Sequence, residues 1–240
     1  MAYQFDFSLI LPCYNEGEHF NRSVDRIIKV LDGTSFSWEI IFIEDASTDT
    51  TANLIKSYIK KNPRKHLSAY FHEKNLGRGK SVSEGVERSQ GKVVGYIDID
   101  CEIPPEYISR FIESVNSGND VVSGWRIYDF TVKSLPRWVA SKGYGLVRNA
   151  VLGEVFKDTE AGYKFFGRNK ILPVVRDCKS PGWFWDTEIM VKASRAKLKI
   201  MEIPVVFIRR FDKTSTVKLI PDTLIYLKEL WNFIKKPPVL

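Results

Sequence analysis

Three carboxylates follow one short apolar run at two-residue intervals. Asp98, Asp100 and Glu102 come directly after residues 93–97. Side chains of an extended backbone alternate with period two, so these carboxylates lie on one side of the chain and repel each other unless a cation lies between them. Magnesium or manganese prefers such oxygen ligands and usually keeps waters and substrate phosphates as its other ligands. The cluster therefore predicts a divalent-metal site, and the alternative is a solvated acidic loop.

The elements around this cluster predict how it is positioned. Short apolar runs alternate with helical patterns, so we expect strands at 7–11, 39–43, 66–72 and 93–97 and helices at 17–32, 50–60 and 78–89. This alternation is typical of a parallel, doubly wound α/β sheet, in which ligands bind at the carboxyl ends of the strands. Polar loops follow three of these strands, at 12–16, 44–49 and 98–102. We therefore expect the three loops to meet at one edge of the sheet.

The second half of the chain is less regular. We expect strands at 119–123 and 200–208 and helices at 134–152 and 187–196. Close to Leu240, apolar residues recur at helical spacing opposite polar and basic ones: Ile220, Leu224, Leu227, Trp231 and Ile234 against Lys228, Asn232, Lys235 and Lys236. A basic amphipathic helix with a tryptophan predicts a membrane-interface anchor, and the alternative is a helix that docks this stripe on the domain's own core. We expect one domain over 1–218 and this helix over 219–240.

Composition and charge limit the classes of partner. With 240 residues, 44% apolar and 27% charged, the chain is typical of a globular protein. Its net charge of +7 favours anionic partners, namely nucleic acid, nucleotides, phosphorylated lipids or an anionic membrane surface, and the charge alone does not choose among them. The positive charge is not gathered into one run, so we expect no nucleic-acid partner. No apolar stretch reaches the roughly 18 to 20 residues that span a bilayer, and we expect no signal peptide.

Other candidate groups are set aside. Residues 75–81 resemble a phosphate loop, but Lys74 stands where that loop needs glycine, so we interpret the glycines as a structural turn into a helix. The three cysteines lack paired spacing, which favours a reducing compartment over a disulfide framework or a zinc site. The three histidines have neither metal spacing nor an obvious triad partner, and we assign them no role.

Four ordered motifs resemble one enzyme family. They are 11–16 (LPCYNE), 44–51 (EDASTDTT), 75–79 (NLGRG) and 98–106 (DIDCEIPPE). They occur in the order found in family 2 inverting glycosyltransferases, and the chain looks most like the dolichyl- or polyprenyl-phosphate sugar synthases over residues 7–217. The resemblance implies a GT-A fold and an activity that takes a sugar from a nucleotide diphosphate.

The resemblance also implies the donor site. It places the base and ribose at Pro12, Tyr14, Glu16, Ile43 and Asp45, and the nucleotide and metal at Asp98, Ile99, Asp100 and Glu102. The family often has glutamine where Glu102 stands. A late motif matches at Arg210 and Ser215, but Lys213 replaces its glycine and Thr216 its lysine. Mg²⁺ or Mn²⁺ is the implied cofactor.

On the acceptor side, the resemblance implies that Arg126 contacts a phosphate and that Arg137 and Ser141 bind the lipid phosphate. Asp158, the motif 162–166 and the acidic motif 184–188 also match the family. We take Asp100, Arg126 and Asp186 as the catalytic residues. Asp186 is the candidate base if the acceptor is a hydroxyl, and it could instead cap the helix that follows.

The sequence therefore predicts a metal-dependent glycosyltransferase that moves a sugar from GDP-mannose or a UDP-hexose to dolichyl or polyprenyl phosphate. An ionised phosphate needs no general base, and arginines would orient it. We expect the protein to lie on the cytoplasmic face of a membrane. The alternative, in the same family, is transfer to a saccharide hydroxyl in cell-surface polysaccharide or glycan synthesis. The sugar and the oligomeric state stay open.

Overall fold

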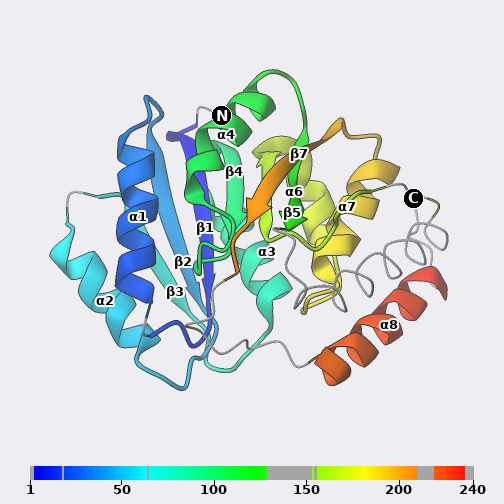
Figure 1. The fold of residues 1–240 in the computed structure, drawn as a ribbon, viewed down its shortest axis with the longest axis horizontal. Coiled ribbons are helices and arrows are strands. Elements are labelled where there is room, and N and C mark those ends of the chain that lie inside the picture. Colours follow the sequence, from blue (N-terminus) through cyan, green and yellow to red (C-terminus); the bar gives the residue numbers. More distant parts are fainter. Residues whose placement is uncertain are drawn as a thin grey trace.

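The computed structural model describes residues 3–17, 19–63, 65–128, 153, 156–209 and 219–235. Within these residues one seven-stranded sheet runs through the molecule (Figure 1). Its order is β3 (Leu67–Phe71), β2 (Trp38–Glu44), β1 (Phe5–Cys13), β4 (Gly91–Ile97), β6 (Tyr163–Gly167), β5 (Val121–Tyr128) and β7 (Ile200–Phe207). β1 is parallel to β2 and β4, β2 is parallel to β3, and β5 is parallel to β7. The expected mostly parallel α/β sheet is therefore confirmed.

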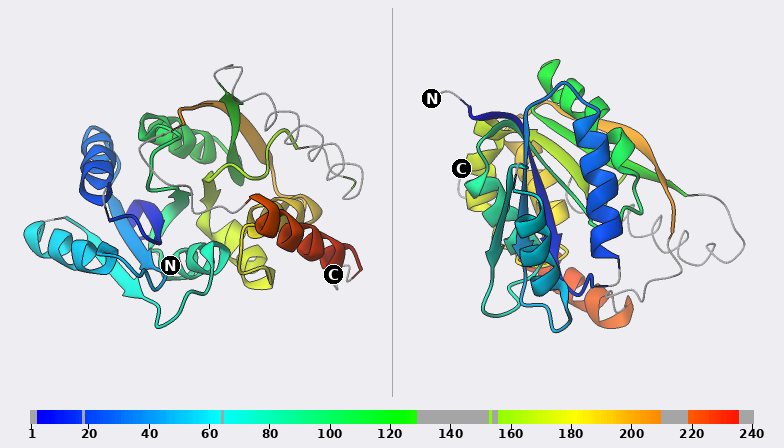
Figure 2. Two further views of the ribbon diagram at one scale, coloured as in Figure 1. Left: turned by 60° about the horizontal axis from the view of Figure 1, so that its bottom comes forward. Right: turned by 90° about the vertical axis from the view of Figure 1, so that its left-hand side faces the viewer.

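Helices cover both faces of the sheet (Figure 2). One face packs against α1 (Phe20–Asp32), α2 (Thr51–Lys61) and α4 (Ile108–Asn116), which follows the short 3₁₀ turn η1 (Pro105–Tyr107). The other face packs against α3 (Arg78–Arg88), α6 (Arg168–Asp177), α7 (Trp185–Arg195) and α8 (Leu219–Lys235). The strands serve both layers because their side chains alternate: Leu9 and Leu11 of β1 lie in the first core and Ile10 in the second.

The strand β6 was not expected from the sequence. It runs antiparallel to both of its neighbours, β4 and β5. Residues 163–166 are all buried, so they lack the alternation of apolar and polar residues by which a half-exposed strand is recognised. Because β6 joins β4 to β5, it connects the sheet of the first half to the strands of the second half.

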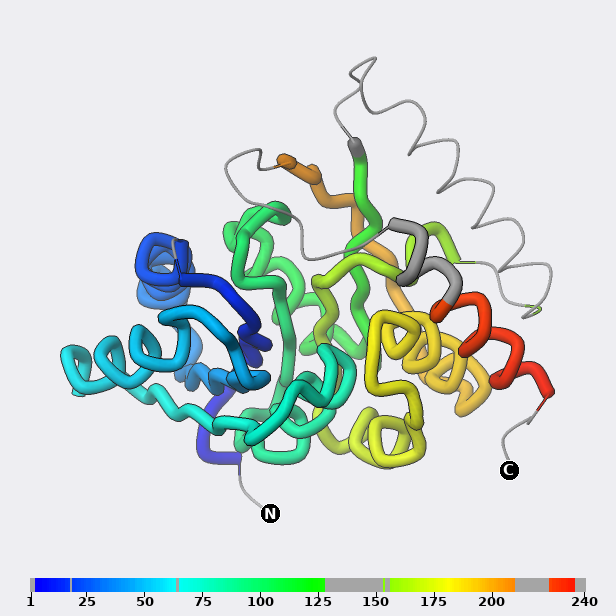
Figure 3. Tube along the Cα trace, turned by 90° about the horizontal axis from the view of Figure 1, so that it is seen from below, coloured from blue at the N-terminus to red at the C-terminus, as the bar shows by residue number. Residues whose placement is uncertain are grey.

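The strand register brings the expected loops to one edge. Cys13 at the end of β1 lies opposite Glu44 at the end of β2, and Glu44 lies opposite Phe71 of β3. On the other side of β1, Ile10 lies opposite Tyr96, so β4 ends close to the same level. Figure 3 views the molecule from the side on which these loops lie. The sequence-based expectation that the loops after β1, β2 and β4 share an edge is confirmed.

The C-terminal helix α8 is present and lies against α7. It docks through Tyr226 and Leu230, which are buried, and through the partly buried Phe233. Phe184 receives the rings of Tyr226 and Phe233 at centroid distances of 5.1 and 5.6 Å. The described members of the expected stripe, Leu227, Trp231 and Ile234, are exposed and do not make this contact. No helix within the described residues has the length and apolar character that a membrane span requires.

Candidate active site

The loops after β1 and β2 are held together by side-chain hydrogen bonds to backbone. The amide of Asn15 donates to Ser47 Oγ at 3.0 Å, and Asn15 Oδ1 accepts from the amide of Thr48 at 2.9 Å. The amide of Glu16 donates to Thr51 Oγ1 at 2.7 Å. Asn15 has φ of 56°, a left-handed conformation that asparagine tolerates better than most residues. The hydroxyl-rich segment after β2 therefore fixes the segment after β1.

The carboxylate of Asp45 binds the backbone of the loop before α3. Its Oδ1 accepts from the amide of Leu76 at 2.7 Å, and its Oδ2 accepts from the amide of Gly77 at 2.9 Å. His72 Nδ1 lies 2.7 Å from Asp45 Oδ1. The side chain of Asp45 is only 5% exposed. The amides that lead into α3 thus bind a carboxylate of the chain itself, and the interpretation of 75–79 as a structural turn is confirmed.

The predicted donor residues divide into two groups. Pro12, Tyr14 and Glu16 are partly exposed at the edge of the sheet. Ile43 and Ile99 are almost fully buried, in opposite cores, so a ligand at this edge would reach their backbone and not their side chains. The structure brings the segments that contain these residues to one edge, while their contacts with a donor stay predictions.

Asp98, the first carboxylate of the acidic cluster, is paired with Arg78. Its Oδ1 accepts from Arg78 Nε at 2.9 Å and from Nη2 at 2.6 Å. Its amide donates to the carbonyl of Gly162 at 3.1 Å, and a Cβ at Gly162 would overlap both the Asp98 carboxylate and the Arg78 guanidinium. Only glycine at 162 therefore lets β6 approach this pair closely enough.

Asp100 and Glu102 follow in a tight turn. The amide of Glu102 donates to Asp100 Oδ1 at 3.2 Å, and both side chains are partly exposed. Among the described residues, no group of three or more His, Cys, Asp or Glu side chains is gathered so as to hold a metal ion. The partly exposed oxygens of Asp100 and Glu102 fit a cation that keeps waters and substrate phosphates among its ligands. The metal role of Asp98, Asp100 and Glu102 stays a prediction.

Arg78 also contacts Asp186, and the two arginine–carboxylate pairs form the centre of a group that is buried apart from Asp98, whose side chain is 41% exposed. We call Arg78, Tyr96, Asp98, Lys164 and Asp186 the Arg78 cluster. Arg78 Nη1 donates to Asp186 Oδ2, while Asp186 Oδ1 accepts from the hydroxyl of Tyr96 and, at 2.8 Å, from Lys164 Nζ. Lys164 Nζ also donates to the carbonyl of Ala161 at 2.6 Å. Both oxygens of Asp186 thus accept hydrogen bonds from charged or phenolic donors.

Burial and charge set the protonation of this cluster. Burial lowers the pKa of the Lys164 ammonium below its ordinary value, and the Asp186 carboxylate opposes that shift without reversing it. Burial acts in the same direction on Arg78, but Asp186 and Asp98 outweigh it and raise the pKa of the guanidinium well above its usual range. Burial and the charge of Asp186 raise the pKa of Tyr96. Arg78 is therefore a permanent cation between two carboxylates.

Arg126, expected to contact a phosphate, forms a two-pronged pair with Asp158. Nε and Nη2 donate to the Asp158 carboxylate at 2.7 and 3.0 Å, and Nη2 lies 3.6 Å from Glu160 Oε2. Burial raises the pKa of Asp158, but the charge and hydrogen bonds of Arg126 outweigh it and hold that pKa below its ordinary value. The side chain of Arg126 is 18% exposed. An anion at this site would share the guanidinium with carboxylates.

Several predictions fall outside the described residues. These are the lipid-phosphate residues Arg137 and Ser141, the helix expected at 134–152, and the late motif with Arg210, Lys213, Ser215 and Thr216. Their roles stay predictions.

Sequence reasoning assigned no role to three members of the Arg78 cluster. Arg78 was counted within a glycine-rich turn, and Lys164 within a family motif. Two local signals point to the cluster: Tyr96, near the end of β4, precedes Asp98 by two residues, and Lys164 is a cation inside the apolar run 163–166. A fully buried lysine requires a carboxylate partner, and Asp186 supplies it.

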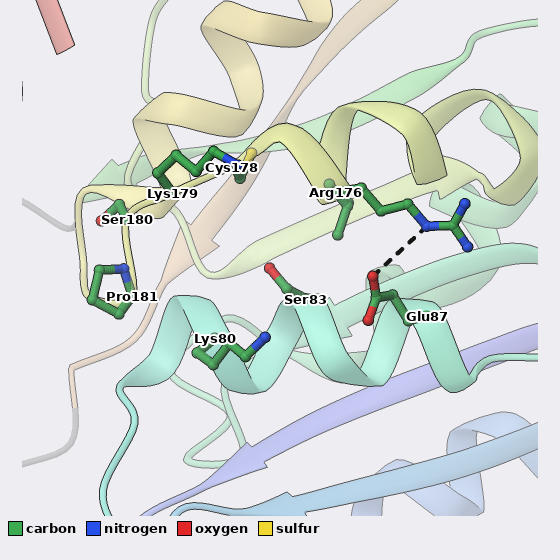
Figure 4. A pocket seen from close by; sticks show the side chains of 9 residues that line it. Lys80, Ser83, Glu87, Arg176, Cys178, Lys179, Ser180 and Pro181 are labelled. Atoms are coloured by element: carbon green, nitrogen blue, oxygen red, sulfur yellow. Dashed lines mark ion pairs between the residues drawn. The ribbon is translucent and has the colours of Figure 1, made fainter.

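A separate pocket of about 210 Å³ lies on the other side of α3. Figure 4 shows Lys80, Ser83 and Glu87 of α3 facing Arg176 and the segment that follows α6. Arg176 Nε lies 3.8 Å from Glu87 Oε1. None of the predicted site residues lines this pocket, so it is distinct from the edge at which the loops meet.

The chain resembles known glycosyltransferases in sequence and structure. It is 28% identical over 244 residues to glycosyltransferase AglD of Haloferax volcanii, covering 98% of this chain and 38% of that protein. It is 30% identical over 212 residues to a dolichyl-phosphate beta-glucosyltransferase of Dictyostelium discoideum, covering 82% of this chain and 65% of that protein. The chain thus spans less than two thirds of the length of these relatives.

A solved structure shows the same fold. Glucosyl-3-phosphoglycerate synthase from Mycobacterium tuberculosis, in complex with Mn²⁺, uridine diphosphate and glucosyl-3-phosphoglycerate, matches with a TM-score of 0.70. The sequence identity is 16%, and the match covers 98% of this chain and 82% of that one. The expected GT-A architecture is therefore confirmed. Residues 8–175 match the profile described as glycosyl transferase family 2, so the chain belongs to this family of glycosyltransferases.

Proposed function

We propose that this glycosyltransferase moves a sugar from a nucleotide diphosphate sugar to the phosphate of dolichol or another polyprenol. The observation that carries the proposal is the state of Asp186, the residue that the sequence predicts as the general base for a hydroxyl acceptor. It is 2% exposed, and both of its oxygens accept hydrogen bonds within the Arg78 cluster. A general base must reach the proton that it removes, and a phosphate acceptor needs none.

The donor end of the proposal rests on the loops after β1, β2 and β4. They supply partly exposed polar groups at one edge of a parallel sheet, where nucleotides bind in such folds. Asp100, with Asp98 or Glu102, would hold Mg²⁺ or Mn²⁺ together with the diphosphate. Such a cation neutralises the charge that develops on a leaving diphosphate. Arg78, a permanent cation beside Asp98, adds a second positive charge at this end.

The acceptor end needs a cation to orient an anionic nucleophile. Arg126 meets this need with a guanidinium that is held rigidly by Asp158 and yet partly exposed. Asp186 then acts as a counter-charge that holds Arg78 and Lys164 in place. The name of the Dictyostelium relative, a dolichyl-phosphate beta-glucosyltransferase, supports the same class of acceptor.

A membrane surface suits this acceptor. The exposed side of α8 carries Leu227, Trp231 and Ile234, with Lys228 and Lys235 beside them, and Lys235 Nζ lies 4.8 Å from the Trp231 ring. Apolar residues bordered by lysines suit the boundary between acyl chains and anionic headgroups. The three cysteines lack the paired sequence spacing of a disulfide framework, which supports a position on the cytoplasmic face.

The test is a transfer assay. The protein is incubated with Mg²⁺ or Mn²⁺, polyprenyl phosphate, and radiolabelled GDP-mannose or UDP-glucose. We expect a labelled lipid that partitions into organic solvent. Label transferred instead to a soluble saccharide would establish the alternative, a hydroxyl acceptor. No transfer from any common donor to either acceptor would refute the proposal.

A further inference from the structure

His72 is not among the predicted site residues, yet its ring contacts two carboxylates. Nδ1 lies 2.7 Å from Asp45 Oδ1, and Nε2 lies 3.0 Å from Glu84 Oε2. The side chain of His72 is 6% exposed, and that of Asp45 is 5% exposed. A neutral imidazole has one N–H and can donate to only one of the two carboxylates, whereas an imidazolium donates to both. The two contacts therefore favour the protonated ring.

The contacts continue from His72 to the Arg78 cluster. Asp45, which contacts the His72 ring, accepts hydrogen bonds from the amides of Leu76 and Gly77. These two residues immediately precede Arg78. From the other side, a Cβ at Gly77 would overlap the carbonyl of Pro181, and the amide of Lys80 donates to that carbonyl at 3.1 Å. The segment that carries Arg78 is thus fixed between Asp45 and Pro181.

We propose that His72, as an imidazolium, is a positioning residue for the donor end of the site. It fixes Asp45, Asp45 fixes the turn at Leu76 and Gly77, and the turn fixes the guanidinium of Arg78 beside Asp98. His72 contacts no reacting atom and acts only through this chain of hydrogen bonds. The proposal rests on the proposed nucleotide-sugar site, because it assigns Arg78 to the end of the site that holds the diphosphate.

The charges around the ring give the pH dependence its sign. Two carboxylates face His72, Asp45 from the loop after β2 and Glu84 from α3, and Arg88 pairs with Glu84 at 2.8 Å. Burial lowers the pKa of His72, but the hydrogen bonds to Asp45 and Glu84 outweigh it and raise that pKa above its ordinary value of 6.5. The stabilisation that protonated His72 gives to Asp45 and its turn is therefore complete below about pH 6.5. It is lost as the pH rises through the raised pKa of His72.

The experiment measures the affinity for UDP and for GDP, each with Mn²⁺, between pH 6 and pH 9. We expect the affinity of the wild type for the nucleotide to fall about tenfold across this range. A tenfold change corresponds to a shift of about one unit in the pKa of His72 when the nucleotide binds. His72→Gln keeps an uncharged N–H donor group, the side-chain amide, but has no titrating proton. It should bind with the weaker, high-pH affinity and with a flatter pH profile. Titration of the nucleotide's own phosphate affects the wild type and the variant equally. A difference between their pH profiles therefore comes from the protein.

Two further variants separate positioning from folding. Glu84→Gln should move the fall in affinity to lower pH, because it removes one of the charges that favour the imidazolium. His66→Gln alters a histidine whose ring lies tilted against that of Phe5 at a centroid distance of 4.9 Å, and it should keep the wild-type profile. Nuclear magnetic resonance can follow the titration directly, since the chain has only three histidines.

The outcomes separate the two proposals. If the wild type binds a nucleotide equally well at pH 6 and pH 9, or if His72→Gln keeps the wild-type profile, the role of His72 is refuted while the nucleotide site stands. If the wild type binds neither nucleotide at any pH, the proposed function fails and the role of His72 fails with it.

Discussion

Lys164 Nζ lies 2.8 Å from Asp186 Oδ1, and the two side chains are 0% and 2% exposed. They come from β6 and the first turn of α7, so this pair joins the middle of the sheet to the helix on its second face. Arg78 adds a third element, because it binds the other oxygen of Asp186 and reaches Asp98 after β4. The interior of the protein is therefore tied electrostatically to the edge at which the donor loops meet.

Lys164 and Asp186 should be strongly coupled in stability. Asp186→Asn leaves Lys164 and part of Arg78 without a counter-charge, and breaking a buried pair in this way costs about 3–5 kcal/mol. Adding Lys164→Met removes the unpaired ammonium. The free energy of unfolding of the double variant should therefore fall by much less than the sum of the falls in the two single variants. Chemical denaturation of the four proteins gives the coupling energy.

The exposed pair Lys65–Asp32 is the matched control for this cycle. It joins the same residue types, but its side chains are 31% and 44% exposed. Lys65→Met and Asp32→Asn should give a coupling of about 0–1 kcal/mol, because water screens the charges. Equal coupling in the two pairs would contradict the view that burial makes the Lys164 pair strong.

Much of the first half of the fold was predictable because its local signals agree. Parallel strands buried on both sides give short apolar runs, and α1 buries Phe20, Val24, Ile27 and Leu31 at helical spacing. The parallel direction of the strands was enough to predict that the loops after β1, β2 and β4 share one edge. The strand β6 was missed because burial of residues 163–166 removes the alternation that marks a strand.

The Arg78 cluster was harder to predict because its members come from distant parts of the sequence. Arg78 and Asp186 are 108 residues apart, and Tyr96 and Asp186 are 90 apart. Their meeting depends on β6 inserting next to β4, which no local pattern indicates. His72 was set aside for a similar reason: its partners are not spaced as metal ligands or a triad, and its role depends on how β3 ends beside the loop after β2.

Asp100 should be needed for the metal-dependent part of nucleotide binding. Ligand binding raises the melting temperature in proportion to RT ln(1 + [L]/Kd), so UDP and GDP are tested with and without Mn²⁺. Asp100→Asn should lose the increment that Mn²⁺ adds and should slow transfer on the order of 100-fold. Asp32→Asn, which removes an exposed carboxylate, is expected to behave as the wild type. An unchanged increment in Asp100→Asn would exclude Asp100 as a metal ligand.

Gly77 should tolerate no side chain, for two separable reasons. Its φ is 93° and its ψ is 154°, a region nearly restricted to glycine that costs an L-residue about 1–3 kcal/mol, and a Cβ would overlap the carbonyl of Pro181. Gly118 has a similar φ of 100° but no atom within 4 Å of a Cβ built there. Gly118→Ala should therefore cost only the conformational term, and Gly77→Ala should cost about 1–3 kcal/mol more. If the two variants lost the same unfolding free energy, the turn at Gly77 would be able to move away from Pro181 without cost.

Asp158 should contribute stability that depends on pH. Its pKa is held below the ordinary value of 3.8, chiefly by Arg126 acting against burial. The contribution is therefore present above about pH 3.8 and is lost as the pH falls through the lowered pKa. Asp158→Asn should cost about 2 kcal/mol at pH 7, the cost of a lost hydrogen-bonded charge. The difference in melting temperature between wild type and variant should shrink as the pH approaches 2.5, and a constant difference would contradict this assignment.

Two leucines of α8 should separate docking from membrane binding. Leu230 is 4% exposed and packs in the core, whereas Leu227, three residues earlier in the same helix, is 44% exposed. Leu230→Ala should cost about 2 kcal/mol or more in unfolding, and Leu227→Ala should stay within about 0.5 kcal/mol of the wild type. Flotation with vesicles of phosphatidylglycerol and phosphatidylcholine should give the opposite order. There Leu227→Ala binds more weakly, Trp231→Ala weaker still, and added salt weakens both because Lys228 and Lys235 face anionic headgroups. Vesicle binding that is unaffected by either exposed substitution would exclude this side of α8 as the membrane contact.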